Sequence, residues 1–541
     1  MQVSGTIVDV RKRRIFKGII HIEGTQIKSI ELSENVDNQY IIPGFIDAHV
    51  HIESSMLVPT EFARLAVVHG TVSTVSDPHE IGNVLGVTGV EYMIENGKQV
   101  NFKFNFGAPS CVPATTFETA GSEITPDQVR YLLEKEEVKY LAEMMNWPGV
   151  LYNDPVVYEK LAIAKSLGKP IDGHAPGLRG EQAETYIKAG IYTDHECFTK
   201  EEALDKLKHG MKISIREGSA AKNFEALIEL LSDYPEMIMF CSDDKHPDNL
   251  VEGHINQLVK RALAKGHELF NVLQAACINP IDHYKLDVGA LQEGDFADFA
   301  CIDNLSDFNV LATYINGEQV SKAGKSLISS KQNDIINNFN CNPIVADDLR
   351  LIATGKHINV IEAFDGQLIT NCIEHAVKID QQGNAISDVE NDVLKLVVIN
   401  RYTPSKPAIA FIRNFGLKEG AIASSVGHDS HNIIAVGVDD VSMAKAINLL
   451  IEAKGGVSAV NAIKSELLPL PVAGIMSAED GYAVAEKYAR IDRMSKAMGS
   501  TLVSPFMSLS FMALLVIPSL KLSDLGLFDG DKFEFKPLFI N

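Results

Sequence analysis

The sequence predicts an α/β protein: a (β/α)₈ barrel of the TIM type, a small β domain formed by segments that flank the barrel, and a C-terminal α+β domain. From Ile41 to about Asn279, short apolar runs alternate with longer helical stretches, as in repeated βα units with a parallel sheet. Eight strand candidates fall in about 240 residues, which matches the size of such a barrel. Polar residues recur at the C-terminal ends of these strands, where such barrels keep their active sites.

The eight candidate strands are five-residue apolar runs, most of which end in a polar residue. They are residues 45–49, 72–76, 102–106, 139–143, 170–174, 191–195, 212–216 and 238–242. We therefore place the barrel at residues 43–285.

The segments on either side of the barrel have the pattern of antiparallel strands. Residues 1–42 contain short alternating runs separated by turns with glycine, and residues 286–325 return to a strand–turn–strand pattern. We expect these two segments to pair in one small β domain. A polar connection then leads to a C-terminal domain at 345–541, in which Leu396–Ile399 is strand-like and Ala444–Ala453 is helix-like before Gly455-Gly456.

The composition limits the partners of this chain. Its 541 residues carry a formal charge of −22, which argues against broad binding to nucleic acid or to an anionic membrane. The seven cysteines form no CxxC pair, the N-terminus has no signal pattern, and the longest apolar run, Phe511–Ile517, is too short to cross a bilayer. We expect a cytoplasmic protein that acts on a neutral or cationic small molecule, with no nucleic-acid or membrane partner.

Histidines and an aspartate at the strand ends suggest a metal site. His49 and His51 are two residues apart at the end of the first strand, so both imidazoles can face the barrel mouth. His174 and His195 end the fifth and sixth strands, and Asp243 directly follows the eighth. Each residue alone could instead be a hydrogen-bonded residue of a turn or of the core, but all would converge at one end of one barrel.

Glu143 lies inside the apolar run Tyr140–Met145 at the end of the fourth strand. An unpaired carboxylate there would cost several kcal/mol to bury. Two divalent ions bridged by the carboxylate would offset this cost, and the alternative is a pair with a buried Arg or Lys.

These residues resemble the ligand set of the amidohydrolase superfamily, and within it the adenine deaminases. Many members of the superfamily have a carboxylated lysine on strand four, whereas this chain has Glu143, as in adenine deaminases. Five longer stretches are also similar to that family: Ser76–Glu80, Ala142–Asn146, Asp172–Gly177, Ser242–Pro247 and His428–Asn432. With these stretches included, the resemblance covers nearly the whole chain.

The resemblance implies hydrolytic deamination of adenine to hypoxanthine and ammonia in purine salvage, by a metal-bound hydroxide. Two divalent ions, Mn or Fe with Zn also acceptable, would be held by His49, His51, Glu143, His174, His195 and Asp243. Asp243 would act as general base and then as general acid. The expected partner is a small-molecule purine, and we expect a homo-oligomer.

The residues that bind the substrate are less strongly indicated. His79 and Arg216 follow or end barrel strands, and His428 and His431 form a compact polar cluster that we expect to reach the barrel mouth. Some related deaminases have a glutamate where this chain has Gly177, so the proton donor to the ring nitrogen stays open; the other candidates near the strand ends are Glu80, Glu217 and Asp244.

Two other functions remain compatible with the sequence. A cyclic-amide or N-acetyl amidohydrolase would use the same metals and the same Asp243. A non-catalytic relative would keep the barrel as a binding module, although such proteins usually lose ligands.

Overall fold

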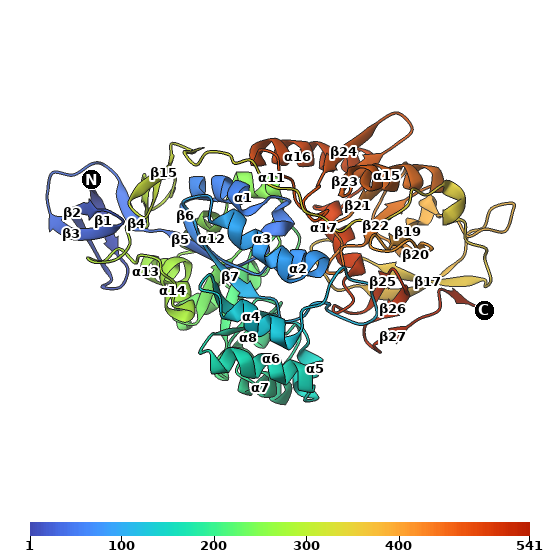
Figure 1. The fold of residues 1–541 in the computed structure, drawn as a ribbon, viewed down its shortest axis with the longest axis horizontal. Coiled ribbons are helices and arrows are strands. Elements are labelled where there is room, and N and C mark those ends of the chain that lie inside the picture. Colours follow the sequence, from blue (N-terminus) through green and yellow to red (C-terminus); the bar gives the residue numbers. More distant parts are fainter.

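A computed structural model describes residues 1–541. Figure 1 shows an elongated molecule with a small sheet at one end, a barrel in the middle and the C-terminal domain at the other end. The predicted fold class is confirmed.

The barrel contains eight parallel strands in sequence order. They are β5 (Phe45–Val50), β6 (Thr71–Ser76), β7 (Lys103–Ala108), β8 (Val138–Met144), β9 (Ile171–Gly173), β10 (Thr193–Asp194), β11 (Lys212–Arg216) and β12 (Ile238–Cys241). Regular pairing forms one sheet from β5 to β9 and another from β10 to β12. Backbone hydrogen bonds join these sheets into a ring, among them Asp243 N to His49 O at 2.9 Å and Tyr192 N to Ile171 O at 3.3 Å.

Helices follow the strands and surround the barrel (Figure 1). Their starts follow local capping chemistry: Thr125 and Gln128 form a capping box at α4, and Asp154 caps α6. The helices of the barrel region are α1 (Pro59–Ala66), α2 (His79–Leu85), α3 (Val87–Gly97), α4 (Pro126–Leu133), α5 (Trp147–Leu151), α6 (Pro155–Ser166), α7 (Gly180–Lys188), α8 (Lys200–Lys208), α9 (Phe224–Leu227), α10 (Leu230–Asp233), α11 (Pro247–Glu252), α12 (Ile255–Ala264), α13 (Leu269–Leu273) and α14 (Asn279–Tyr284).

The small sheet contains strands from both flanking segments. Its order is β16-β15-β14-β13-β4-β1-β2-β3, and β4 and β13 form the antiparallel pair that joins the two segments. The strands are β1 (Gln2–Asp9), β2 (Arg14–Glu23), β3 (Gln26–Leu32), β4 (Tyr40–Pro43), β13 (Phe299–Ile302), β14 (Val310–Ile315), β15 (Glu318–Lys322) and β16 (Lys325–Ser326). Gly44 links β4 to the first barrel strand, and a side chain there would collide with Val72.

The C-terminal domain combines a mixed sheet with three helices. Its strands are β17 (His357–Glu362), β18 (Asn371–Ala376), β19 (Val393–Ile399), β20 (Ala408–Arg413), β21 (Ala421–Ser424), β22 (Ile433–Gly437), β23 (Gly456–Val460), β24 (Ser465–Pro469) and β28 (Phe539–Ile540). The helices are α15 (Asp440–Ala453), α16 (Gly481–Ala497) and α17 (Pro505–Ser510), and β25 (Leu520–Ser523), β26 (Gly526–Asp529) and β27 (Glu534–Phe535) form a separate small sheet. α15 begins at Asp440 rather than at Ala444, because Asp439 caps it.

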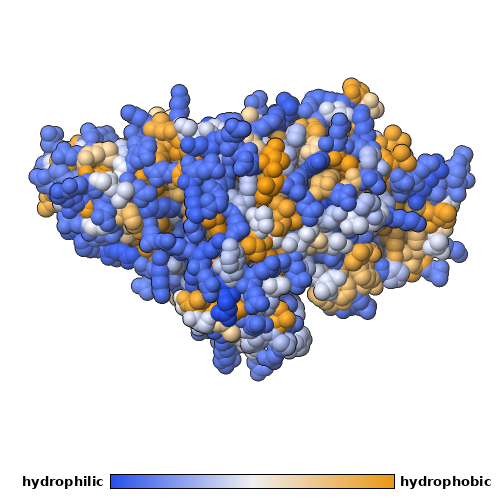
Figure 2. Space-filling model, viewed as in Figure 1, coloured by the Kyte–Doolittle hydropathy of each residue, from blue (hydrophilic) through white to orange (hydrophobic).

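The surface is mainly hydrophilic on the face drawn in Figure 2, in keeping with the formal charge of −22. None of the helices combines the length and the apolar character that a membrane crossing requires.

Candidate metal centre

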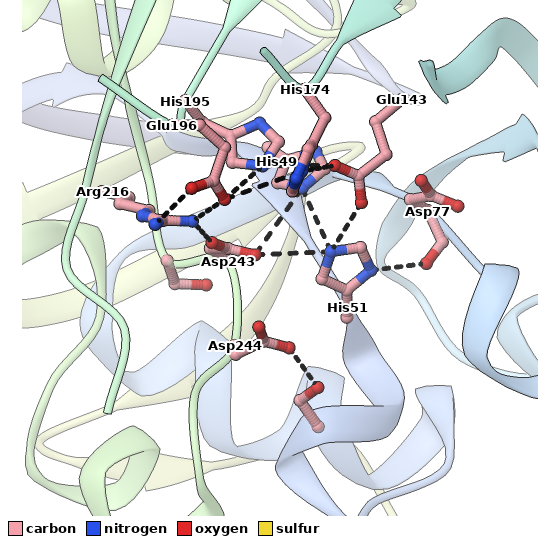
Figure 3. Close-up of polar contacts among 12 residues, drawn as sticks. His49, His51, Asp77, Glu143, His174, His195, Glu196, Arg216, Asp243 and Asp244 are labelled. Atoms are coloured by element: carbon pink, nitrogen blue, oxygen red, sulfur yellow. Dashed lines mark hydrogen bonds and ion pairs between the residues drawn. The ribbon is translucent and has the colours of Figure 1, made fainter. Parts of the chain in front are cut away.

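All six predicted ligand residues meet at the C-terminal end of the barrel, and all are buried. Glu143 at the end of β8 connects three of them: its carboxylate oxygens lie 2.8 Å from His174 Nδ1, 3.3 Å from His195 Nε2 and 3.3 Å from His51 Nε2. Asp243 Oδ1 lies 3.3 Å from His51 Nε2 and 3.7 Å from His49 Nε2. Figure 3 shows these side chains pointing toward one another from different strands.

The unpaired atoms of this cluster fit a divalent metal centre. His49 Nδ1 and His174 Nε2 are buried without a hydrogen-bond partner. His49 Nε2 and His51 Nε2 lie 3.2 Å apart, a distance at which at least one ring nitrogen must be unprotonated. Among the groups of ligand atoms that lie within 4.8 Å of one another, His49–His195–Asp243 and Glu143–His174–His195 share His195. Shared histidine and carboxylate donors are typical of two neighbouring divalent ions.

The charges in the cluster compensate one another. Burial alone would raise the pKa of Glu143, but the surrounding imidazoles, His174 first, hold it well below its usual range. Burial would lower the pKa of His195, whereas its hydrogen bond to Glu143 raises it to about 9. In the metal-free chain, protons on imidazoles such as that of His195 thus balance the carboxylates, whereas burial holds the pKa of His49 well below its usual range. Divalent ions would replace these protons.

Arg216 lies behind Asp243 and does not line the cavity at the metal cluster. Its fully buried guanidinium donates to Oδ2 of Asp243 and to both carboxylate oxygens of Glu196, with Nη2 2.8 Å from Oε2. Burial would raise the pKa of Asp243, but Arg216 and the histidines hold it well below its usual range. These contacts favour a role for Arg216 in positioning Asp243 rather than in contacting substrate.

Asp47 fixes the strands that carry two of the ligands. Its carboxylate accepts hydrogen bonds from the backbone N–H of Ser242, at 2.9 Å, and from His254 Nε2, at 2.8 Å. Because Asp47 is on β5 and Ser242 follows β12, this contact ties the strand ends of His49 and Asp243 together. The backbone of Asp243 has a φ of 54°, a left-handed conformation that is uncommon for residues other than glycine and recurs at functional sites.

His79 lies beside the metal cluster. Its Nδ1 is 3.2 Å from Asp77 Oδ2 and 3.5 Å from Glu143 Oε1, and its Nε2 is 3.7 Å from Asp429 Oδ1. His51, Asp77, His79 and Glu143 form a further group of close ligand atoms. His79 could therefore contact either an ion or a substrate.

Residues of the C-terminal domain cover the barrel mouth. His428 donates to the carboxylate of Glu80 at the start of α2, and His431 Nε2 contacts the other oxygen of the same carboxylate. The ring of Phe511 stacks on His428, with 4.8 Å between the centroids and 18° between the planes. The His428–His431 cluster thus reaches the barrel mouth, as we expected from the sequence. His428 lines the cavity, and His431 lies behind it.

The cavity above the cluster has a volume of about 20 Å³. Other residues line part of it, namely Met145, Glu196, Leu368, Asp429, Phe511 and Leu514. Of these, Met145 and Asp429 lie in stretches that the sequence had indicated, and none was predicted as a site residue. Glu196 had a usable signal, because it directly follows the candidate ligand His195 at the end of a strand. Leu368, Phe511 and Leu514 had none, because their position depends on how the C-terminal domain packs on the barrel.

Comparisons with known proteins agree with this architecture. The sequence profile of the amidohydrolase family matches residues 40–320, and the profile of the adenine deaminase C-terminal domain matches residues 367–534. The chain is 53% identical to the adenine deaminase of Salinibacter ruber over 100% of this chain and 99% of the relative. It is 54% identical to that of a Sulfurovum species and 53% identical to that of Methanosarcina acetivorans, each over 99% of both chains. The chain therefore belongs to the adenine deaminase family, within the amidohydrolases.

Proposed function

We propose that this chain hydrolyses adenine to hypoxanthine and ammonia. The observation that carries the proposal is the buried cluster of six histidine and carboxylate ligands, covered by a C-terminal domain that its family shares. In the reaction the C6–N bond breaks, a C6–O bond forms with the oxygen of water, and the amino group leaves as ammonia.

We propose two divalent ions, Mn or Fe with Zn also acceptable, held by the six residues of the cluster. Glu143 would hold both ions, because it alone of the six contacts His51, His174 and His195. Bound divalent ions lower the pKa of water from 15.7 to about 7, which makes a nucleophile available at neutral pH.

Asp243 is the residue best placed to move protons. Its carboxylate faces the cluster with Oδ1, while Arg216 fixes Oδ2. Because its pKa is held low, it is ready as a carboxylate to accept a proton from water and to pass that proton to the leaving amine. Arg216 would keep the carboxylate in one orientation through both transfers.

Asp244 is our candidate for the proton donor to the purine ring. Burial, and then the neighbouring Asp243, raise its pKa, which favours a protonated carboxyl group. Asp244 lines the cavity, and Ser54 Oγ donates to its Oδ1 at 2.5 Å. Asp244→Asn should lower kcat for adenine and leave the metal content unchanged.

Apolar side chains around the cavity suit the faces of a purine ring, namely Met145, Leu368, Phe511 and Leu514. The cavity of about 20 Å³ holds about one water molecule and no purine. Substrate entry therefore requires the segments of Leu368 and Phe511 to move, as in enzymes whose loops open and close over the site.

The test is release of ammonia from adenine by the metal-loaded protein, with hydantoin and N-acetylglucosamine as amide substrates for comparison. We expect turnover of adenine and none of the amides. Asp243→Asn should abolish turnover, and the matched change Asp347→Asn, at an exposed surface residue, should not. Turnover of an amide instead of adenine would contradict the proposal.

Other expectations from the sequence remain proposals. We propose a place in purine salvage, a cytoplasmic location and a homo-oligomer, the last to be measured by light scattering. We also propose the domain division at 1–42 with 286–325, 43–285 and 345–541, which limited proteolysis in the connection before residue 345 would test.

A further inference from the structure

A polar groove of about 610 Å³ lies apart from the metal cluster, between the barrel and the C-terminal domain. Its walls come from the loop after β11, from α11 and from α16; Figure 1 shows α11 and α16 side by side. Five cationic and four acidic side chains line it, namely Lys222, Lys245, Arg261, Arg493 and Lys496 with Glu217, Asp248, Glu252 and Asp492. The groove is therefore slightly cationic in a chain whose formal charge is −22.

Two of the cations lack a carboxylate partner. Lys245 is only 8% exposed, and its ammonium has one polar contact, the backbone oxygen of Glu217 at 3.4 Å. Arg493 forms no ion pair. By contrast, Arg261 is paired with Glu217 at 2.6 Å and Lys496 with Asp492 at 2.7 Å. Burying an ammonium whose N–H donors have no acceptors costs free energy of folding, and an anion in the groove would offset that cost.

Two carboxylate oxygens in the same groove lack a donor. Asp248 Oδ1 and Glu217 Oε2 are buried without any hydrogen-bond partner. Asp248 and Lys245 form no ion pair with each other, so both remain available to a ligand. A free phosphate would satisfy Lys245 but not the carboxylates, and an amine would do the reverse.

We propose that this groove binds a phosphorylated sugar, either free or as part of a nucleotide. The phosphate group would bind Lys245 and Arg493, and the sugar hydroxyls would donate to Asp248 and Glu217. The groove is large enough for such a molecule, since ligand pockets typically measure about 300–1,000 Å³.

The test uses Arg493, because Lys245 lies next to Asp244 in the candidate active site. Isothermal titration calorimetry of the metal-loaded full chain with ribose 5-phosphate should show one site per chain. Arg493→Ala should weaken this binding by about tenfold or more. Asp248→Asn should weaken it as well, because the amide nitrogen cannot accept a hydrogen bond from a hydroxyl.

The matched control is Arg490→Ala, which removes the same charge from α16 outside the groove, where Arg490 pairs with Glu466 at 3.2 Å. We expect wild-type affinity in this variant. Ribose and inorganic phosphate should each bind at least about tenfold more weakly than ribose 5-phosphate.

A further titration with AMP, at saturating hypoxanthine so that the purine site is filled, distinguishes a nucleotide from a free sugar phosphate. The proposal is overturned if neither phosphorylated compound binds at millimolar concentration, if binding is unchanged in Arg493→Ala, or if inorganic phosphate binds as well as ribose 5-phosphate.

Discussion

Glu80 of the barrel accepts a hydrogen bond from His428 of the C-terminal domain, although the two residues are 348 positions apart in the chain. Burial would raise the pKa of Glu80, but His428 and His431 hold it well below its usual range. The pKa of His428, which burial alone would lower, rises to about 9 through Glu80. The pair is thus a charged contact between the two domains at the edge of the cavity.

Removing this contact tests whether the C-terminal domain is part of the active site. His428→Ala and His431→Ala should each lower kcat/KM for adenine by about tenfold or more, roughly 1.4 kcal/mol of transition-state stabilisation. Metal content and circular dichroism should stay as in the wild type. His375→Ala, at a partly exposed site on β18, is the control. Normal kinetics in both variants would assign the cluster to local structure.

Glu143→Gln keeps the shape of the side chain but replaces one carboxylate oxygen with an amide nitrogen that cannot bind metal. We expect the second ion to be lost and turnover to fall by about 100-fold or more. Elemental analysis and the ammonia assay measure the two effects, with the exposed Glu136→Gln as control. A variant with two ions and near-normal turnover would refute the bridging role.

Arg216→Lys should change the pH dependence of the reaction. The Arg216 guanidinium lowers the pKa of Asp243, and a single ammonium cannot hold both Asp243 and Glu196 in the same way. The pKa of Asp243 should therefore rise, and the acid limb of the kcat/KM profile should move to higher pH. Arg350→Lys, an exposed residue, should leave the profile unchanged. If Arg216 only contacts substrate, KM alone should change and the acid limb of the profile should stay in place.

Metal affinity should rise with pH up to about 9. His195 binds an ion only as neutral imidazole, and its pKa in the metal-free chain is about 9. At pH 7 metal binding must therefore displace the proton of His195, whereas above pH 9 this proton is already largely lost. Calorimetry in two buffers of different ionisation enthalpy measures this release. Equal proton release at pH 7 and pH 9.5 would show that metal binding does not displace a proton from His195.

Lys521 should matter for closure over the site. Its fully buried amino group donates to the carbonyl oxygens of Leu368, at 2.6 Å, and Phe511, at 3.1 Å, and both residues line the cavity. Lys521→Met leaves both carbonyls without this donor, so KM for adenine should rise severalfold, while the exposed Lys532→Met should have no effect.

The same lysine predicts a pH effect on stability. Burial lowers the pKa of Lys521 to about 7 in the folded chain. Between pH 7 and about 10, the unfolded chain therefore has a proton on this lysine that the folded chain lacks. Because the unfolded state binds more protons, the folded wild type gains stability as pH rises over this range. Chemical denaturation over this range should show that gain in the wild type and less of it in Lys521→Met. Equal pH dependence in both proteins would contradict it.

The sequence by itself determined the barrel and the positions of the candidate ligands. Local apolar runs located all eight strands, because strand residues repeat with a short period and need no distant partner to be recognised. His49, His174, His195 and Asp243 could be grouped from the sequence because the C-terminal ends of parallel strands lie at the same end of a barrel. By contrast, the sequence pattern indicates a start of α15 at Ala444, which is too late. The helix begins at Asp440, because the cap Asp439 precedes the apolar pattern.

Only the tertiary structure decided what surrounds those ligands. Arg216 ends a strand as a substrate-binding residue would, yet its guanidinium pairs with Glu196 and Asp243, a choice that depends on the neighbouring strands. Phe511 lies in an apolar run that could belong to any core, and the packing of two domains places it over the cavity. Strand periodicity is a local property of the chain, whereas contacts such as Glu80–His428 form only when segments hundreds of residues apart are brought together by burial of the surface between them.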